Sequence, residues 1–345
     1  MQRIVGICGY HSTGSSALCS LLHELDEIQM LDEREFDIIR LPDGLQDLDY
    51  SLNRFQHYET ATVAIKRFKK AISDSTFGKN LISNKQKAML TEQFINNVVQ
   101  IRWNGDAPTN KIKEIFRRKY RNVLSKLSRR SMHFEVLIII YKLLFNDSRE
   151  FSMFPDNFLK HAQNYVNQLL LAIGQDENKI TILNKCFHAY DPVACFKYFD
   201  SPKAIVVNRD PRDLYIHTYK DGQRRAKELI PLQDINSFIE YYKRSRMSIP
   251  NFNTRDDVLF INFESLVYDY ENTVNLLIDF VGASSNHVKK GEKFNIGLAK
   301  SYTQLFLNHK DFEDDIKKIE QELPEFLFPF EKYTNIEIAG GPSIN

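Results

Sequence analysis

Short apolar runs alternate with helical patterns at both ends of the chain. Four runs are short, apolar and mostly β-branched, and we predict them as strands: residues 3–8, residues 179–186, Lys203–Asn208 and Val258–Asn262. Helical patterns follow at Pro192–Tyr198 and at residues 211–221, 234–248 and 268–281. This alternation predicts an α/β fold, a P-loop-like and mostly parallel sheet flanked by helices. In such a sheet, ligands bind at the carboxyl ends of the strands.

The middle of the chain has a different pattern. Residues 54–176 carry long helical patterns and few β-branched runs, so we predict a large helical insertion after the first βα unit. Residues 1–53 and 177–338 then form the α/β core, and residues 339–345 are expected to be a mobile tail. The most apolar run, residues 136–145, is interrupted by Lys142 and is too short to cross a bilayer.

One predicted helix of the insertion is strongly basic. Residues 111–130 contain nine Lys or Arg residues against a single acid, Glu114, and they keep an apolar face at helical spacing. A solvated helix face would explain this charge. The functional alternative is a surface that binds an anionic polymer, such as an anionic acceptor glycan.

Composition narrows the class of protein. With 345 residues, 43% hydrophobic and 26% charged, the chain is typical of a globular protein. The net charge of +1 gives no global field for nucleic acid, so no nucleic-acid partner is expected. The first strand leaves no room for a targeting segment, and the four cysteines show no metal-ligand spacing. We therefore expect a cytoplasmic protein without a metal.

A glycine-bounded loop directly follows the first predicted strand. Gly9 to Ser16 read G-Y-H-S-T-G-S-S, and this spacing matches G-x-x-x-x-G-K-[ST] except that Ser15 replaces the lysine. The pattern predicts a phosphate-like anion at a helix N-terminus, while the missing lysine argues against hydrolysis of ATP or GTP. An ordinary βα turn is the alternative. The candidate anion-binding residues are His11, Ser12, Thr13, Gly14, Ser15 and Ser16, with Thr13 also a possible N-cap.

A second motif follows the run Lys203–Asn208. Arg209 leaves the predicted strand end, Pro211 suits a first helical turn, and Asp210 and Asp213 complement the helix N-terminus. An arginine held there, with a polar side chain such as His217 two turns later, can clamp a phosphate. A structural Arg–Asp capping network would explain the same residues.

Taken together, the two motifs resemble the sulfotransferases that use 3′-phosphoadenosine 5′-phosphosulfate (PAPS). The resemblance implies that the glycine loop binds the 5′-phosphosulfate and that Arg209 binds the 3′-phosphate, with His217 where the family carries a serine. Lys290 and Gly291 resemble the family's late basic-glycine segment, which contacts the same phosphate. Ser12 departs from the family, which carries Lys or Arg there; His11 or a distant lysine could supply the charge.

Further likenesses are to the carbohydrate O-sulfotransferases of this family. Lys185 stands where they carry a lysine, and Glu35 follows the first helix where they carry a catalytic glutamate. The resemblance implies that Lys185 neutralises the leaving oxygen and Glu35 is the base. Asp32, Glu33, Asp43, His188 and His11 are alternative bases.

The expected function is sulfuryl transfer from PAPS, as co-substrate, to a carbohydrate hydroxyl by in-line displacement. Animal glycan sulfotransferases are Golgi-anchored, so a chain without an anchor favours a bacterial capsular or surface polysaccharide as acceptor. The alternatives are a non-catalytic anion- or nucleic-acid-binding protein, a degenerate nucleotide-binding fold and, third, a kinase. A kinase would need a cation in the glycine loop, and Ser15 does not provide one.

Overall fold

The chain divides into two compact units. The computed structural model describes residues 3–31, 35–54, 60–106, 111–124, 126, 132–221, 228–284 and 290–333. An α/β unit comprises Met1–Asp37 and Gly174–Asn345, and a helical unit comprises Ile38–Ile173. The sequence pattern predicts both boundaries of the helical insertion later in the chain, between residues 53 and 54 and between residues 176 and 177. The predicted tail, residues 339–345, lies outside the described residues.

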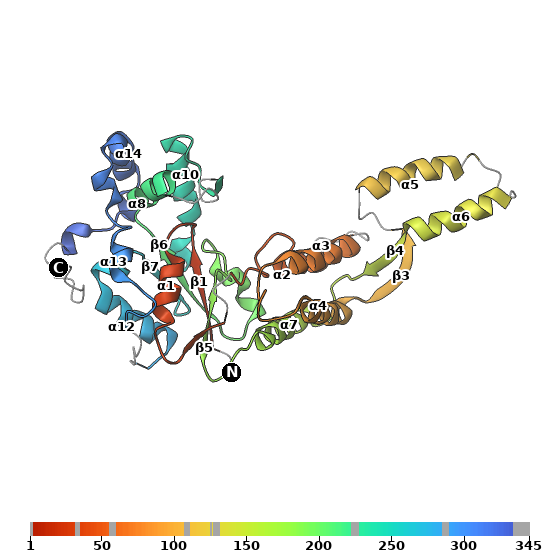
Figure 1. The fold of residues 1–345 in the computed structure, drawn as a ribbon, viewed down its shortest axis with the longest axis horizontal. Helices are drawn as coiled ribbons and strands as arrows, with labels where there is room; N and C mark the ends of the chain where they lie inside the picture. Colours follow the sequence, from red (N-terminus) through yellow and green to blue (C-terminus); the bar gives the residue numbers. More distant parts are fainter. Residues whose placement is uncertain are drawn as a thin grey trace. The chain divides into compact units, whose positions relative to one another are not determined.

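A parallel sheet forms the centre of the α/β unit. Among the described residues it has five strands in the order β2-β5-β1-β6-β7, and all four pairings are parallel (Figure 1). The strands are β1 (Arg3–Gly9), β2 (Ile28–Met30), β5 (Ile180–Asn184), β6 (Lys203–Asn208) and β7 (Val258–Asn262). The α/β prediction is confirmed, and β2 is an addition to the four predicted strands.

Side chains on both faces of this sheet are buried. On one face, α1 (Ser15–Leu22) and α12 (Tyr270–Val281) contribute Leu18 and Leu277 to a core that includes Ile205 of β6. A second core joins α8 (Pro211–Ile216), α10 (Ile235–Arg246) and α14 (Glu313–Glu322). Because both faces are covered, β5 is buried along its whole length, as its continuous apolar sequence indicates.

Short helical elements complete the α/β unit. They are α11 (Ser265–Tyr268), α13 (Ile296–Lys300), a π-helical turn at His217–Asp221, and 3₁₀ turns at Pro192–Tyr198, Ile249–Asn251, Leu305–Asn308, Lys310–Phe312, Pro324–Phe326 and Phe330–Tyr333. The helix predicted at 211–221 is therefore α8 continued by the π-helical turn, and the one predicted at 192–198 is a 3₁₀ helix.

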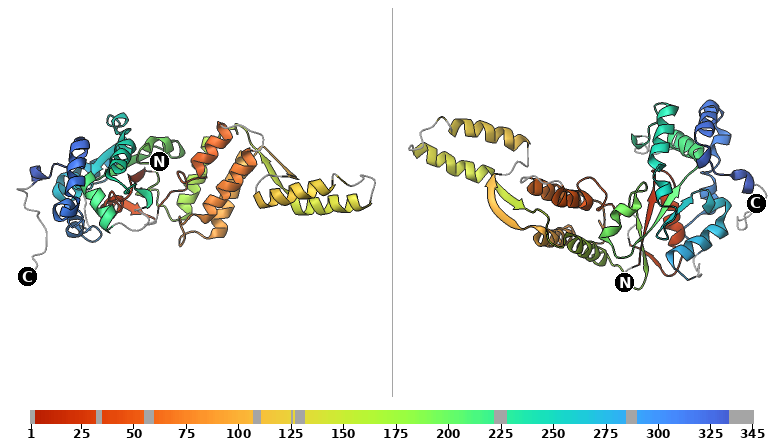
Figure 2. Two further views of the ribbon diagram at one scale, coloured as in Figure 1. Left: turned by 90° about the horizontal axis from the view of Figure 1, so that it is seen from above. Right: turned by 180° about the vertical axis from the view of Figure 1, so that it is seen from behind.

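The helical unit has a layer of helices and a distal hairpin (Figures 1 and 2). The layer consists of α2 (Leu45–Asn53), α3 (Thr60–Asp74), α4 (Asn84–Val98) and α7 (Phe158–Ala172). Phe94 stacks on Tyr165 with ring centroids 4.9 Å apart and meets Phe68 edge-on. An antiparallel ribbon of β3 (Ile101–Asp106) and β4 (Asn146–Phe151) carries the hairpin of α5 (Lys111–Leu124) and α6 (Met132–Phe145).

None of the helices in the described part of the chain combines the length and the apolarity needed to cross a membrane. All four cysteines are buried, and none of them forms a disulfide.

Candidate functional site

Three of the predicted site segments lie at the carboxyl edge of the sheet. The glycine loop follows β1, Lys185 follows β5 and Arg209 follows β6, and these three strands are neighbours. The Lys185 backbone N–H donates to the Ile7 carbonyl at 2.7 Å. The strand order reverses here, since the chain continues to β2 and β5 on one side of β1 and to β6 and β7 on the other. Doubly wound sheets bind their ligands at this kind of position.

The loop holds an uncommon backbone conformation. His11, Ser12 and Gly14 have φ values of 59°, 53° and 91°, and Lys185 beside the loop has 53°. For residues other than glycine such conformations cost of order 1–3 kcal/mol each and are concentrated at functional sites. Added to Gly14, a Cβ would lie 2.3 Å from the Phe263 ring, so only glycine fits at that position.

Gly14 begins helix α1. Gly14 is the N-cap, and no side chain in the described part of the chain caps this helix end. The Thr13 hydroxyl instead accepts the Tyr10 backbone N–H at 3.1 Å and closes the loop, so the expectation of Thr13 as N-cap is wrong. Ser15 is buried and Ser16 is exposed at the first turn. The backbone amides of an uncapped helix start are oriented to bind an anion.

Arg209 links the loop to a late segment of the chain. Its side chain is 3% exposed; Nη1 donates to the Ser12 carbonyl at 2.9 Å and Nη2 donates to the Tyr302 carbonyl at 2.5 Å. Within the described residues, its buried Nε has no hydrogen-bond acceptor. The guanidinium also lies over the Phe263 ring, 5.3 Å from its centroid. The Nε–H of Arg209 is therefore a buried donor without an acceptor among the described residues.

His217 is brought to the same region. It begins the π-helical turn, and its ring meets the Tyr302 ring edge-on at 5.4 Å. Tyr302 therefore contacts both predicted phosphate-binding side chains, because its carbonyl accepts a hydrogen bond from Arg209 and its ring meets that of His217.

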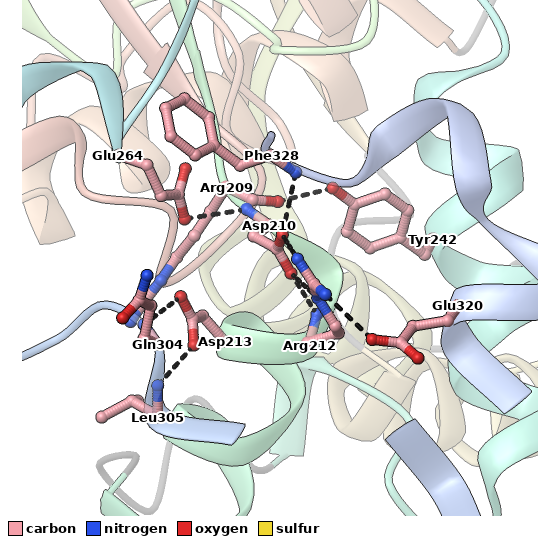
Figure 3. Close-up of polar contacts among 10 residues, drawn as sticks. All are labelled: Arg209, Asp210, Arg212, Asp213, Tyr242, Glu264, Gln304, Leu305, Glu320 and Phe328. Carbon is pink, nitrogen blue, oxygen red and sulfur yellow. Dashed lines mark hydrogen bonds and ion pairs between the residues drawn. The ribbon is translucent and has the colours of Figure 1, made fainter. Parts of the chain in front are cut away.

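The acids around Arg209 form a capping network (Figure 3). Asp210 caps α8 and pairs with Arg212 at 2.7 Å, and its backbone N–H donates to Glu264 at 2.9 Å. The two carboxylate oxygens of Asp213 accept the backbone N–H groups of Gln304 and Leu305, each at 2.7 Å. The acids and Arg212 therefore form a structural capping network, which was the alternative interpretation of this motif. Their hydrogen bonds fix the backbone around Arg209.

Burial perturbs the ionisation of this cluster. Desolvation, followed by repulsion from Asp210, raises the pKa of Asp213 to about 7 and that of Glu264 to about 8. Desolvation lowers the pKa of Arg209, against the attraction of Glu264, Asp213 and Asp210.

The two predicted catalytic residues form an ion pair. Lys185 Nζ donates to Glu35 Oε1, and both side chains are partly exposed, at 31% and 41%. The Phe36 backbone N–H donates to the Asn184 carbonyl at 2.8 Å, which fixes the segment of Glu35 beside the end of β5. A carboxylate and an ammonium group thus lie together at the carboxyl edge of the sheet.

The sequence analysis did not identify Arg246 of α10, which contacts Asn208 at the end of β6 and Tyr10 at the start of the loop. It is 1% exposed and lies between the rings of Tyr10 and Tyr242, 4.1 and 3.5 Å from their centroids. Nε donates to Asn208 Oδ1 at 2.9 Å, and no carboxylate of the described residues pairs with the guanidinium. The sequence pattern does indicate that Arg246 is buried, since it follows Phe238 and Tyr242 at four-residue spacing on the buried face of the helix.

Other predicted residues lie apart from these contacts. Lys290 pairs with Glu271 at 2.7 Å on the surface, and Gly291 has a φ of 82°. Asp43 belongs to the helical unit and pairs with Arg67 at 2.7 Å. The His188 ring stacks on Tyr190 at 4.9 Å. The alternative bases Asp32 and Glu33 lie outside the described residues. Among the described residues, no cluster of His, Cys, Asp or Glu could hold a metal ion.

No family model matches the chain, and no curated protein matches it. Among solved structures, it is similar to the sulfotransferase domain from the curacin biosynthetic pathway, with 14% identity, a TM-score of 0.43, and coverage of 95% of this chain and 99% of that one. The sulfotransferase domain from the Synechococcus PCC 7002 olefin synthase is 12% identical, with a TM-score of 0.41 and coverage of 92% and 93%. Retinol dehydratase in complex with androsterone and inactive cofactor PAP is 11% identical, with a TM-score of 0.34 and coverage of 99% and 79%.

Replacing Gly14 by alanine should destabilise the protein. A Cβ there would meet the Phe263 ring at 2.3 Å, in addition to the strain at a φ of 91°. Gly174→Ala is a matched control, because Gly174 has a φ of 96° and no heavy atom within 4 Å of the added Cβ. In urea unfolding, we expect Gly14→Ala to lose about 1–3 kcal/mol more than Gly174→Ala. Equal losses would show that the Phe263 contact contributes nothing.

The raised pKa values of Asp213 and Glu264 predict that stability falls with rising pH. Between the unfolded pKa of about 4 and the folded values of about 7 and about 8, the folded state holds protons that the unfolded state has released. The free energy of unfolding should therefore fall between about pH 5 and about pH 8, by about 1 kcal/mol per pH unit for each of the two carboxyl groups until its folded pKa is reached. Urea unfolding at several pH values measures this slope.

Glu264→Gln should reduce the slope, since the amide oxygen can still accept the Asp210 N–H. Replacing the exposed Glu240 by Gln is the control and should leave the slope unchanged. A wild-type stability that rises through this pH range would contradict the assignment.

Proposed function

We propose that this protein is a sulfotransferase that moves a sulfuryl group from PAPS to a hydroxyl of a carbohydrate. The observation that carries the proposal is the hydrogen bond from Arg209 to the Ser12 carbonyl. It brings the glycine loop and the arginine segment, 197 residues apart in sequence, to one edge of the sheet. PAPS carries a phosphosulfate at the 5′ position and a phosphate at the 3′ position of its ribose. A protein that binds PAPS therefore needs two anion sites close together.

The residues at this edge suit an anion with several charges. Backbone N–H groups at the start of α1, with the hydroxyls of Ser15 and Ser16, would hold the 5′-phosphosulfate. The unused Nε of Arg209 supports binding of the 3′-phosphate, because a phosphate oxygen is a stronger acceptor than a carbonyl. His217 would add a ring N–H. Lys290 and Gly291 are assigned to the same phosphate by resemblance.

The ion pair of Glu35 and Lys185 supplies the catalytic groups of the proposal. PAPS, when bound, provides the activated sulfuryl group. Glu35 takes the proton of the acceptor hydroxyl as the oxygen–sulfur bond forms. Lys185 Nζ stabilises negative charge on the bridging oxygen, which leaves with adenosine 3′,5′-bisphosphate. The two side chains form an ion pair in the free protein, and in-line transfer would separate them, because the acceptor oxygen and the leaving oxygen lie on opposite sides of the sulfur.

A carbohydrate is the proposed acceptor class. Glu35 provides a carboxylate base in the place where glycan sulfotransferases carry theirs. A hydroxyl acceptor requires such a base, because its proton must leave during transfer. A bacterial capsular or surface polysaccharide fits this proposal.

Ligand-induced stabilisation tests the donor site. Adenosine 3′,5′-bisphosphate should raise the thermal midpoint more than ADP or ATP, since a ligand at about 100 times its Kd adds about 2.7 kcal/mol. Arg209→Lys should remove the preference for the bisphosphate, because a lysine lacks the guanidinium Nε. The control is Arg244→Lys, which changes an exposed arginine paired with Glu240. An equal response to ATP would favour a kinase, and no response to any nucleotide would favour a non-catalytic protein.

Removal of the proposed base tests the chemistry. Glu35→Gln should lower kcat by about 100-fold in a transfer assay with a carbohydrate acceptor, because a positioned base contributes about 10²–10⁴-fold. Binding of adenosine 3′,5′-bisphosphate should survive. Asp43→Asn is the control, since Asp43 is an alternative base that pairs with Arg67. A near-normal rate for Glu35→Gln would reject the assignment, and a loss with Asp43→Asn alone would transfer it to Asp43.

A further inference from the structure

A polar groove lies between α4 and α7, two neighbouring helices of the helical unit (Figure 1). It has a volume of about 390 Å³ and is lined by Gln93, Phe94, Asn96, Asn97, His161, Asn164, Tyr165 and Gln168. The lining positions are i, i+1, i+3 and i+4 on α4, and i, i+3, i+4 and i+7 on α7. Each helix therefore contributes one continuous stripe of side chains, and the two stripes form the two walls of the groove.

The floor of the groove is aromatic. The rings of Phe94 and Tyr165 stack 4.9 Å apart with an interplanar angle of 12°, and these side chains are 3% and 1% exposed. The hydroxyls of Tyr165 and Thr91 are hydrogen-bonded to each other at 2.9 Å. Because the stacked rings fill the space between the helices, they hold the two walls at a fixed separation.

The walls of the groove are mostly amides. Five of the eight lining residues are Asn or Gln, and none is Lys, Arg, Asp or Glu. Asn96 Oδ1 accepts a hydrogen bond from Arg102. No hydrogen bond to a described residue is made by the side chains of Gln93, Asn97, Asn164 and Gln168. Each of these four amides therefore keeps an NH₂ donor and a carbonyl acceptor for a ligand.

Helix stability does not explain these amides. Asn164 is exposed in the interior of α7, where asparagine is a poor helix former. Lysine and glutamate form helices better and are common at exposed positions, yet α7 contains one lysine, Lys160, and no Arg, Asp or Glu. The amide stripe is therefore explained by binding rather than by folding.

The chemistry of the walls selects the ligand. A phosphate or a carboxylate would need a cation, and no lysine or arginine lines the groove. An apolar ligand would bury the amides without hydrogen bonds, which is costly. An extended peptide is bound by a strand edge or an aromatic-lined apolar groove, and two helices with amide walls offer neither. Each sugar hydroxyl both donates and accepts, so the neighbouring hydroxyls of a neutral sugar match these walls.

We propose that this groove binds a neutral sugar residue of a glycan. The amides of Asn97 and Asn164 exchange hydrogen bonds with the sugar hydroxyls from opposite walls, and the ring edges at the floor contact its C–H groups. The volume lies within the roughly 300–1,000 Å³ of small-molecule sites. Binding itself does not depend on sulfuryl transfer, whereas the inference that the bound glycan is also the acceptor rests on the proposed function.

Isothermal titration calorimetry of the full chain tests the groove. The probes are neutral tetrasaccharides of glucose, galactose, mannose and N-acetylglucosamine, and at least one should bind with a Kd of about 1 mM or lower. Asn97→Ala/Asn164→Ala should weaken that binding by about 10- to 30-fold, because each hydrogen bond contributes a factor of roughly five. The matched control, Gln86→Ala/Gln163→Ala, replaces two exposed amides outside the groove on the same helices and should bind normally.

NMR of the ¹⁵N-labelled chain reports binding to the unaltered groove. The side-chain NH₂ signals of Asn97 and Asn164, assigned from the single alanine variants, should shift when the sugar is added. Those of Gln86 and Gln163 should not. This measurement locates the ligand even where a variant changes the stability of the protein.

Three results would overturn the proposal. One is that none of the four tetrasaccharides binds. Another is that the sugar binds Asn97→Ala/Asn164→Ala as tightly as the wild type. The third is that N-acetyl-tetraalanine amide shifts the same NH₂ signals at a lower concentration than the sugar, which would make the groove a peptide site.

The donor site is measured separately, by stabilisation of the wild-type protein with adenosine 3′,5′-bisphosphate. A protein that responds to the bisphosphate but binds no sugar rejects the groove alone. A protein that binds the sugar in the groove but does not respond to the bisphosphate rejects the donor site alone.

Discussion

The burial of one arginine organises the carboxyl edge of the sheet. Arg209 is 3% exposed, and removing a guanidinium from water is costly unless its donors and its charge are compensated. Two donors are satisfied by the carbonyls of Ser12 and Tyr302, and attraction from Glu264, Asp213 and Asp210 opposes the desolvation of the charge at pH values where these acids are ionised. The loop after β1, the end of β6 and the segment before residue 305 therefore hold their relative positions through one side chain.

The surrounding acids stabilise the fold by accepting hydrogen bonds from backbone amides. Asp213 accepts from Gln304 and Leu305, Asp210 accepts from Phe328, and Glu264 accepts from Asp210. Each bond ties the start of α8 to a part of the chain distant in sequence. Among the described residues, the buried Nε of Arg209 has no acceptor. Desolvation raises the pKa values of Asp213 and Glu264, and the backbone hydrogen bonds that these acids accept oppose that rise.

Local patterns were sufficient to predict the core strands and the residues that follow them. β6 and β7 lie at the predicted bounds, because each is a continuous apolar run that ends at a polar residue. The loop, Lys185 and Arg209 could be placed at one edge because parallel strands end on the same side of a sheet. The contact of Glu35 with Lys185 was not predictable, since it depends on how the segment after β2 packs beside β5.

Other features of the structure could not be predicted from the sequence pattern. β2 is three residues long, and the β3–β4 ribbon pairs polar segments without an apolar alternation. The sequence also does not indicate the boundary between the two units near residue 38. The predicted boundary at residue 53 has a helical pattern on both sides of it. Arg246 was missed for a different reason. An arginine near the end of a helix is usually a solvated residue, and only tertiary packing shows that it lies between Tyr10 and Tyr242.

Arg246 also bears on the uncharged Ser12. The guanidinium is buried against Tyr10 at the start of the glycine loop, and its charge is compensated by two aromatic rings and by hydrogen bonds to Asn208 and Ser245. A lysine or arginine at position 12 would add a second cation near an unpaired one and raise the electrostatic cost of the free protein. An anion at the loop would lower that cost, because Arg246 acts through low-dielectric protein. A buried cation against Tyr10 and a neutral residue at position 12 are therefore mutually consistent.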